Sequence, residues 1–400
     1  YRMFLIVLLG VCTFHCGLAS SSAASMADYE NLPPFAKTGV KSNVLLVMDY
    51  SGSMQFPAHH PVNFDDYDGD RVADCGDYYP DSNSIEVETS YDSSKDYYGY
   101  FDSDKYYDYD NLNDYWEPVS GSNLPTDRVG NSNEISGNLL NFLTMSRIDL
   151  ARKALIGGKS DSCSDSSCIL KAQGGWRYVK VTNLGLIAYV RPGEDWSSLD
   201  IDDKDMLIDV FDSNNSNSEI GEFDSRHVNV KVNSERNGIV QNNFDSVQFG
   251  YIAYANVGNS NLDQGTIKHG VKNSNMTELV DSIQETVPYQ GTDTGEAMWE
   301  AYDYLVQSDD HNYRDNSDYI NEESEKDPYY KTVNDVPQSA WCRKSFVVLI
   351  SDGEYNGNVD PVNPAHEMHT NDLRTDLQNN QTAKVYSLFA FSDDESGENS

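Results

Sequence analysis

The sequence predicts an α/β protein whose doubly wound, mostly parallel central sheet is flanked by helices. Short continuous apolar runs are typical of strands buried on both faces of a sheet. Four such runs occur, at residues 43–48, 247–255, 346–350 and 384–391. Apolar residues with helical spacing lie between them, at residues 138–155, 276–286 and 295–307. Because strands and helices alternate along the chain, we expect helices to cover both faces of a parallel sheet.

Local signals support these segments. The run 43–48 reads Asn-Val-Leu-Leu-Val-Met and ends directly before Asp49. At the helix expected over 276–286, Asn275 precedes the first turn and Glu278 follows three residues later, which is a capping signal. The helix expected over 138–155 has apolar residues spaced three to four apart, which gives it one apolar face.

Three insertions interrupt this expected scaffold. Residues 56–135 are acidic and rich in tyrosine, and residues 157–245 contain alternating runs that predict a small β subdomain. Residues 308–340 are polar and are expected to form a long loop.

The charge and the amino-terminal segment indicate an exported protein. The chain has 28 Lys and Arg against 65 Asp and Glu, a formal net charge of −37, which disfavours nucleic acid as a partner. The apolar run at residues 4–14, followed by small residues, predicts a signal peptide over residues 1–27. That run is too short to cross a bilayer, so we expect no membrane span.

Four cysteines remain after removal of the expected signal peptide. Cys163 and Cys168 are separated by four residues and are expected to form a local disulfide, because no second pair completes a four-ligand metal site. Cys75 and Cys342 are the default remaining pair, with a free thiol at either position as the alternative.

Oxygen-bearing side chains follow the ends of two predicted strands and open one predicted helix. Asp49, Ser51 and Ser53 come directly after the first strand, Asp352 follows the strand at 346–350, and Thr292 precedes the helix at 295–307. Ligands bind at the carboxyl ends of the strands in open α/β sheets. These hard oxygen ligands suit Mg²⁺, Mn²⁺ or Ca²⁺ and argue against zinc or copper.

This pattern of Asp-x-Ser-x-Ser, Gly-Thr-x-Thr and Asp-Gly-Glu resembles the metal-ion-dependent adhesion site (MIDAS) of von Willebrand factor A (VWA) domains. The resemblance implies that Ser51, Ser53 and Thr292 ligate the ion directly and that Asp49 and Asp352 bind it directly or through water. It also implies a VWA domain over residues 28–400, whose C-terminal end we expect to lie beyond residue 400.

Three further tracts, at residues 97–102, 136–149 and 295–302, resemble the PilY-type family of type IV pilus adhesins and biogenesis proteins. Members of that family place an A domain before a C-terminal β-propeller. The resemblance covers most of residues 40–392, and no part of the sequence corresponds to the propeller.

The acidic insertion contains a second candidate metal site, a possible calcium loop. Oxygen ligands recur at alternating positions from residue 66 to residue 77, with Arg71 where glycine is usual, in a pattern similar to the calcium loops of thrombospondin type 3 repeats. The candidate ligands are Asp66, Asp68, Asp70, the Val72 carbonyl, Asp74 and Asp77. The alternative is an acidic surface that is merely solvated.

A tyrosine cluster in the same insertion has two interpretations. It can pack an insertion that has few aliphatic residues, or it can offer an adhesive surface, since tyrosine supplies rigid amphipathic area at low entropic cost. The cluster includes Tyr97, Tyr98, Tyr100, Tyr106, Tyr107 and Tyr109.

The function predicted from these features is a secreted, non-enzymatic, metal-dependent binding module of a type IV pilus-associated protein. An open position on the MIDAS cation accepts a carboxylate from a pilus subunit or from a host or surface ligand. We expect it to be extracellular, pilus-associated or at the cell surface after passage through the periplasm and outer membrane. The alternative is a calcium-stabilised structural domain at a pilus tip or cell surface. A secreted metal-dependent hydrolase is least favoured, because Ser51 does not lie in a nucleophile elbow.

Overall fold

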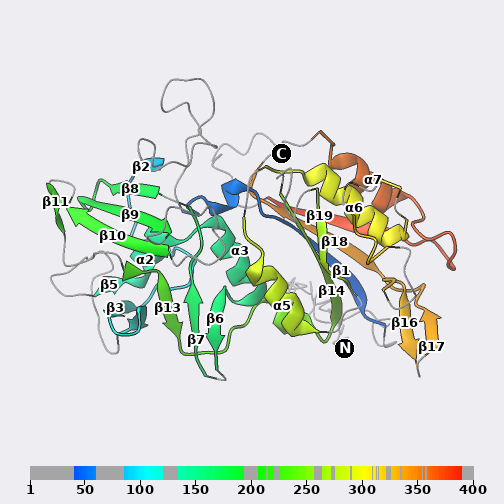
Figure 1. Cartoon of the computed structure of the whole chain (residues 1–400), viewed down its shortest axis with the longest axis horizontal. Helices are drawn as coiled ribbons and strands as arrows, with labels where there is room; N and C mark the ends of the chain where they lie inside the picture. The colour runs from blue at the N-terminus through cyan, green and yellow to red at the C-terminus, as the bar shows by residue number, and fades with distance from the viewer. Residues whose placement is uncertain are drawn as a thin grey trace, which may run out of the picture. The chain divides into compact units, whose positions relative to one another are not determined.

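A computed structural model gives the protein a mixed α/β fold with several sheets (Figure 1). The chain divides into two compact units, Tyr1–Val40 and Lys41–Ser400, and every described element belongs to the second. The described residues are 40–59, 85–119, 134–164, 166–175, 177–192, 206–212, 215–219, 226–255, 264–271, 275–288, 291–308, 310–311, 313, 315–320, 326–333, 336–353, 355 and 358–389. The expected signal peptide, the calcium-loop residues 66–77 and Cys75 lie outside them.

The central sheet has five strands in the order β15-β14-β1-β18-β19, and the four predicted strands are all in it. β1 is parallel to both β14 and β18, β18 is parallel to β19, and only β15 is antiparallel to its neighbour β14. The bounds are β1 Ser42–Asp49, β14 Val247–Tyr254, β15 Thr266–His269, β18 Ser345–Ser351 and β19 Ala383–Phe389.

Helices pack against both faces of this sheet. Alternate residues of β1 point to opposite faces, and both sets of side chains are apolar and buried. Leu45 and Val47 share a buried cluster with residues of α6 and α7. Leu46 and Met48 belong to another cluster with residues of α3, α4 and α5. The bounds are α3 Arg147–Ile156, α4 Ile239–Asn243, α5 Met276–Glu285, α6 Thr294–Val306 and α7 Val362–Thr370.

Three sequence predictions need correction. β19 was expected to be buried on both faces, but Tyr386, Leu388 and Phe389 are each more than half exposed, because β19 is an edge strand among the described residues. The single helix expected over 138–155 is two helices, α2 Gly137–Thr144 and α3. The expected loop at 308–340 contains a hairpin of β16 Tyr330–Val333 and β17 Val336–Ser339.

The break between α2 and α3 has a local cause in Ser146. Its Oγ accepts a hydrogen bond from the Asp149 backbone amide over 3.3 Å, and its own backbone amide donates to the Asp149 carboxylate over 3.1 Å. This reciprocal pair is a capping box, which starts a new helix at Arg147. The apolar periodicity continues across the break and therefore hides it.

Strands from two of the predicted insertions pair with each other in two further six-stranded sheets. One has the order β11-β10-β9-β8-β2 with β12 beside β10, and the other has the order β5-β3-β4-β13-β7-β6. The bounds are β2 Ile85–Thr89, β3 Tyr106–Asp110, β4 Tyr115–Pro118, β5 Ile135–Ser136, β6 Ser160–Cys163, β7 Cys168–Lys171, β8 Arg177–Val181, β9 Leu186–Pro192, β10 Met206–Asp212, β11 Asn215–Glu219, β12 Arg226–His227 and β13 Asn229–Val232.

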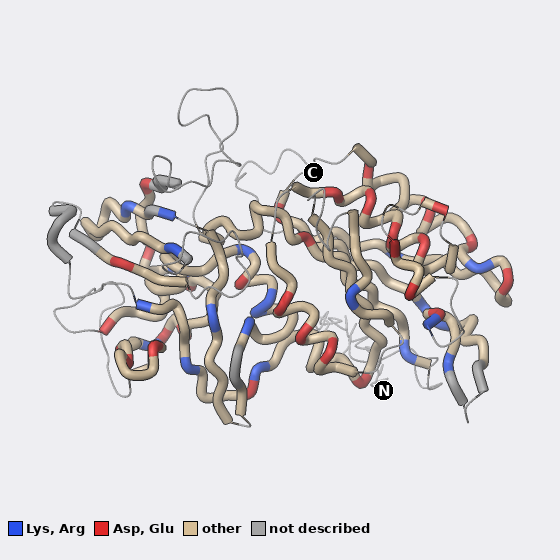
Figure 2. Tube along the Cα trace, in the orientation of Figure 1, with Lys and Arg blue, Asp and Glu red and all other residues tan. Residues whose placement is uncertain are grey.

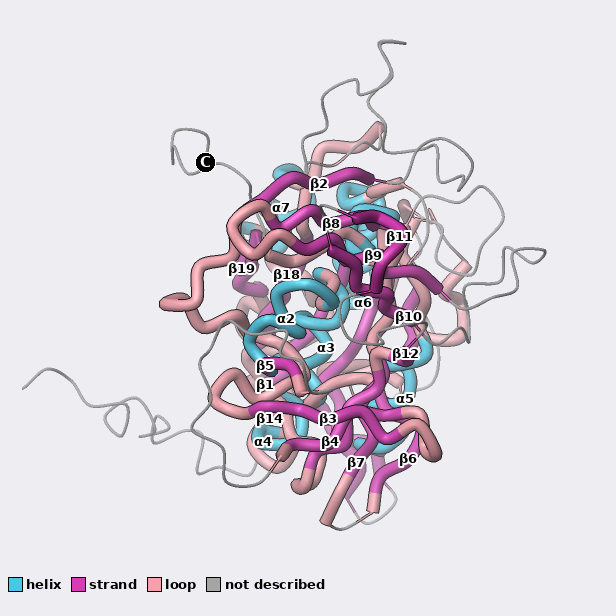
Figure 3. Tube along the Cα trace, turned by 90° about the vertical axis from the view of Figure 1, so that its left-hand side faces the viewer, coloured by secondary structure: helices cyan, strands magenta, loops and turns pink. Residues whose placement is uncertain are grey.

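Helix α2 lies between these two sheets (Figures 1 and 3). All eight of its residues are buried, as expected for a helix enclosed on all sides. Its leucines share one core cluster with Val179 and Val190 of one sheet and with Trp116 and Val230 of the other. The two insertions therefore form one β-rich region with a common core.

Most of the tyrosine cluster packs inside this region. Tyr100, Tyr106, Tyr107 and Tyr109 are buried, whereas Tyr98 is 51% exposed. The packing interpretation therefore holds for these four side chains, and Tyr98 is left at the surface.

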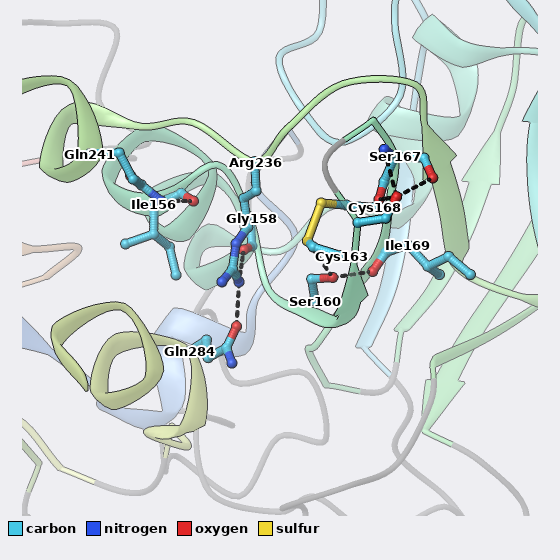
Figure 4. The surroundings of a disulfide bond; sticks show 11 residues. Ile156, Gly158, Ser160, Cys163, Ser167, Cys168, Ile169, Arg236, Gln241 and Gln284 are labelled. Carbon is cyan, nitrogen blue, oxygen red and sulfur yellow. Dashed lines mark hydrogen bonds between the residues drawn. A yellow bond between two sulfur atoms is a disulfide. The ribbon is translucent and has the colours of Figure 1, made fainter. Parts of the chain in front are cut away.

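The expected disulfide between Cys163 and Cys168 is present and closes the β6–β7 hairpin (Figure 4). The Ser160 hydroxyl donates to the Ile169 carbonyl over 2.7 Å in the same hairpin. Nearby, Arg236 donates hydrogen bonds to the Gly158 carbonyl and to Gln284 of α5. Cys342 is exposed, and its pairing with Cys75 stays a prediction.

Charges of both signs are spread along the described trace, with acidic residues along α6 (Figure 2). Among the described residues, no helix combines the length and apolar character needed to cross a bilayer.

Candidate metal centre at the carboxyl edge of the central sheet

The central sheet brings two of the predicted ligand segments together. β1 and β18 are adjacent and parallel, with Met48 opposite Ile350. Asp49 ends β1, and Asp352 follows Ser351 at the end of β18, so both carboxylates lie at the same edge. After Asp49 the chain turns into a short 3₁₀ helix, η2 Gly52–Gln55, which carries Ser53.

Four of the five predicted ligands form one chain of hydrogen bonds. The Ser51 backbone amide donates to Asp49 Oδ1 over 2.7 Å, and the hydroxyls of Ser51 and Ser53 lie 2.8 Å apart. The Ser53 hydroxyl donates to Asp352 Oδ1 over 2.8 Å. Residues separated by about three hundred positions in sequence are therefore in direct contact at this edge.

Thr292 is buried in the segment that opens α6, two residues before Thr294. The Thr294 hydroxyl donates to the Tyr254 hydroxyl over 3.3 Å. Tyr254 ends β14, and its carbonyl accepts a hydrogen bond from the Tyr50 amide, next to Asp49. Burial first, and then the charge of Asp49, raise the pKa of Tyr254 well above its ordinary value.

The electrostatics of the site are dominated by two buried carboxylates. Burial, followed by the charge of Asp352, raises the pKa of Asp49 to about 7. Burial also raises the pKa of Asp352, and the adjacent Arg147 guanidinium opposes that rise. Two buried like charges that interact are unfavourable unless a cation or protons offset them.

Two residues of this site were not predicted from the sequence. Ser351, the last residue of β18, donates from its hydroxyl to Asp49 Oδ2 over 2.7 Å and orients that carboxylate. Arg147, the first residue of α3, donates from Nη1 to Asp352 Oδ2 over 3.0 Å. The Ser146 capping box was the signal that could have placed Arg147 at a helix start, although nothing in the sequence indicates its partner.

The donor set fits a hard divalent cation. The four groups in contact are two carboxylates and two hydroxyls, which are the oxygen ligands that Mg²⁺ and Ca²⁺ prefer, and Thr292 stays a predicted fifth ligand. Burial raises the pKa values of both Asp49 and Asp352 by disfavouring their charged forms, and a bound cation would stabilise those charged forms. Among the described residues, no group of three or more His, Cys, Asp or Glu side chains is arranged for a metal.

The chain is thus a mixed α/β protein with an oxygen-lined site at one edge of a mostly parallel sheet. Residues 88–193 match the family model described as "PilY1 homolog, small alpha/beta domain". This match supports a PilY1-related protein, and it spans α2, α3 and strands β3 to β9. No curated protein and no solved structure matches the chain.

Proposed function

We propose that the protein is a non-catalytic, metal-dependent binding module of a type IV pilus-associated protein. The cation is Mg²⁺, or Mn²⁺ or Ca²⁺ in its place, held by Asp49, Ser51, Ser53, Thr292 and Asp352 in a MIDAS. The observation that carries this proposal is the continuous hydrogen-bonded chain from Asp49 through Ser51 and Ser53 to Asp352.

The arrangement of the central sheet supports a doubly wound VWA-type domain. Three parallel strand pairs, β14–β1, β1–β18 and β18–β19, form its body, and helices pack on both faces. The candidate ligands follow the carboxyl ends of adjacent strands, where such sheets bind their ligands.

Each side chain has a defined task in this proposal. Ser351 and the Ser51 amide hold the Asp49 carboxylate in one orientation, and Arg147 does the same for Asp352. Ser51 and Ser53 present adjacent hydroxyl oxygens. When bound, the cation supplies a positive centre that attracts a carboxylate from a partner.

The family match supports an association of this binding module with type IV pili. A PilY1-like segment suggests pilus association, and hence an extracellular or cell-surface location with pilus subunits or a surface ligand as partners. The acidic loop at residues 66–77 stays a candidate second site for Ca²⁺.

A structural role for the cation is a second candidate, which burial favours. Asp49 is 0% exposed and Asp352 is 4% exposed, so a cation held between them would lie partly beneath the surface. Such a cation stabilises the sheet edge without a partner.

Calorimetric titration of the protein with Mg²⁺ and Ca²⁺ tests the proposal and separates the two candidates. We expect one ion at this site, lost in Asp49→Ala and kept in Asp245→Ala, which changes an exposed aspartate before β14. Loss of pilus or surface binding together with the ion supports the binding module. Loss of thermal stability alone supports the structural role, and no ion at the site contradicts both.

A further inference from the structure

A pocket of about 570 Å³ opens in the β-rich region, apart from the metal centre. It is lined by the loop at residues 96–105, by Tyr107 and Pro118, by Lys153 of α3, and by residues 231–234 at the end of β13. None of its lining residues is among the five candidate metal ligands. This volume is typical of sites for small molecules.

Three lysines line this pocket in a chain that has only 28 Lys and Arg. Lys105 pairs with Asp102 over 2.7 Å, and Lys231 pairs with Glu117 over 2.5 Å. Lys153 differs from both, because it has no hydrogen bond or ion pair with any residue that the structure describes. Its ammonium group is therefore available to an anion in the pocket.

The surroundings of Lys153 favour pairing with such an anion. Burial lowers the pKa of Lys153, and the charge of Asp102 opposes that effect. A partly buried ammonium without a partner is less stable than one paired with a carboxylate. Lys153 thus gives the pocket one ammonium that forms no ion pair with a described residue, and Asp96 and Asp102 are the acidic groups of its lining.

The rest of the lining is aromatic and polar. Tyr98 is the exposed member of the tyrosine cluster, and its ring offers a flat apolar surface next to a hydroxyl. Asn233, Ser234 and Asp96 add groups that exchange hydrogen bonds with hydroxyls. A ligand that suits this lining has one anionic group, several hydroxyls and an apolar face.

Helix α2 holds the aromatic side of the pocket in place. Asn141 Nδ2 donates to the carbonyls of Tyr97 and Phe101, both over 2.8 Å, and its Oδ1 accepts from the Phe101 amide over 3.0 Å. Asn138 Oδ1 accepts from the Tyr97 amide over 2.7 Å. Because these buried amides fix the loop at both Tyr97 and Phe101, the pocket is preorganised, which reduces the cost of binding.

We propose that this pocket binds a sugar that carries a carboxylate, with Lys153 pairing with the carboxylate and Tyr98 packing against the sugar ring. A monosaccharide or disaccharide fits the volume, and its hydroxyls match Asp96, Asn233 and Ser234. A nucleic acid is disfavoured by the net charge of −37. The site would give the protein a second means of surface recognition that needs no metal.

Titration calorimetry with glucuronic acid, galacturonic acid and N-acetylneuraminic acid tests this proposal, with glucose as the uncharged comparison. We expect at least one acidic sugar to bind and glucose to bind about tenfold more weakly or not at all, because a hydrogen bond to a charged group is lost. Lys153→Met should weaken binding about tenfold and Lys153→Arg should restore most of it. Tyr98→Ala should weaken it about fivefold.

Two controls keep this result separate from the metal centre and from folding. Lys180→Met removes a partly exposed lysine of β8 that pairs with Glu88 outside the pocket and should leave sugar binding unchanged. EDTA and Asp49→Ala should also leave it unchanged, so failure of the metal site does not affect this test. Absence of binding by all three acidic sugars overturns the proposal, as does full binding by correctly folded Lys153→Met or preferential binding of an acidic peptide.

Discussion

Arg147 donates a hydrogen bond from Nη1 to Oδ2 of Asp352 over 3.0 Å, and the two side chains are only 3% and 0% exposed. The guanidinium also lies over the Phe56 ring, 5.6 Å from its centroid. Arg147 therefore brings a fixed positive charge to the site and offsets one of its two carboxylates. Asp352 Oδ1, which accepts from Ser53, is the oxygen that faces the candidate ligands.

We predict that Arg147→Met lowers stability without metal and increases the effect of a divalent cation. Removing one partner of a buried ion pair costs about 3 kcal/mol or more, because the remaining carboxylate is uncompensated. The same uncompensated charge attracts a cation more strongly, so saturating Mg²⁺ should stabilise the variant more than the parent protein. Urea unfolding with and without Mg²⁺ measures both quantities.

Arg374→Met is the matched control, because Arg374 forms a buried pair with Asp327 over 2.7 Å outside the site. It should lower stability and leave the response to Mg²⁺ unchanged. An equal Mg²⁺ response in Arg147→Met and the parent protein would contradict the proposed charge balance.

The Ser146 cap at the start of α3 should contribute to the stability of the protein. Its hydroxyl accepts from the Asp149 amide and has two acceptors for its single proton, Asp149 Oδ2 and the Gln173 carbonyl. Ser146→Ala therefore leaves buried polar groups without that partner. We expect a loss of about 2 kcal/mol in the free energy of unfolding. The exposed cap Asn275→Ala on α5 should cost about 1 kcal/mol or less, and equal losses in urea titrations would argue against a special role for Ser146.

We expect the imidazole of His59 to contribute to the pH dependence of the free energy of unfolding. Burial lowers the pKa of His59 below its ordinary value of 6.5, although its Nε2 donates to the Tyr98 carbonyl over 2.8 Å. Between the lowered folded pKa and 6.5, the unfolded chain binds the proton more readily, so this contribution to stability is lost as the pH falls through that window. His59→Gln should remove it.

The free energy of unfolding is measured for the parent protein and for His59→Gln over the same pH values. The buried carboxylate Asp149 acts in the opposite direction, because burial raises its pKa and favours the folded state as the pH falls. Only the difference between the parent protein and His59→Gln therefore isolates the histidine. If the two curves run parallel below the ordinary pKa of histidine, the contribution of His59 is absent.

The parts of the fold that the sequence predicted were those specified by local patterns. The strand endings placed Asp49 and Asp352 correctly, because a buried parallel strand and the turn after it are specified by a few adjacent residues. The exposure of Tyr386 on β19 was not predictable in this way, since it depends on which strands lie beside it. The pairing of β4 with β13, more than a hundred residues apart, likewise has no local signal.

Gly99 lies in the loop that α2 holds beside the pocket, where there is no room for a side chain. A Cβ atom on Gly99 would lie 2.2 Å from Asn141 Oδ1 and 2.6 Å from Met145 Cγ, and both residues are buried. Asn141 cannot move away without losing its hydrogen bonds to Tyr97 and Phe101. Gly99→Ala should therefore cost about 2 kcal/mol in stability and weaken acidic-sugar binding.

Gly353→Ala is the matched control, because nothing lies within 4 Å of its added Cβ. Equal stability of the two variants in urea titrations would show that the loop yields and that the pocket is not preorganised by Asn141.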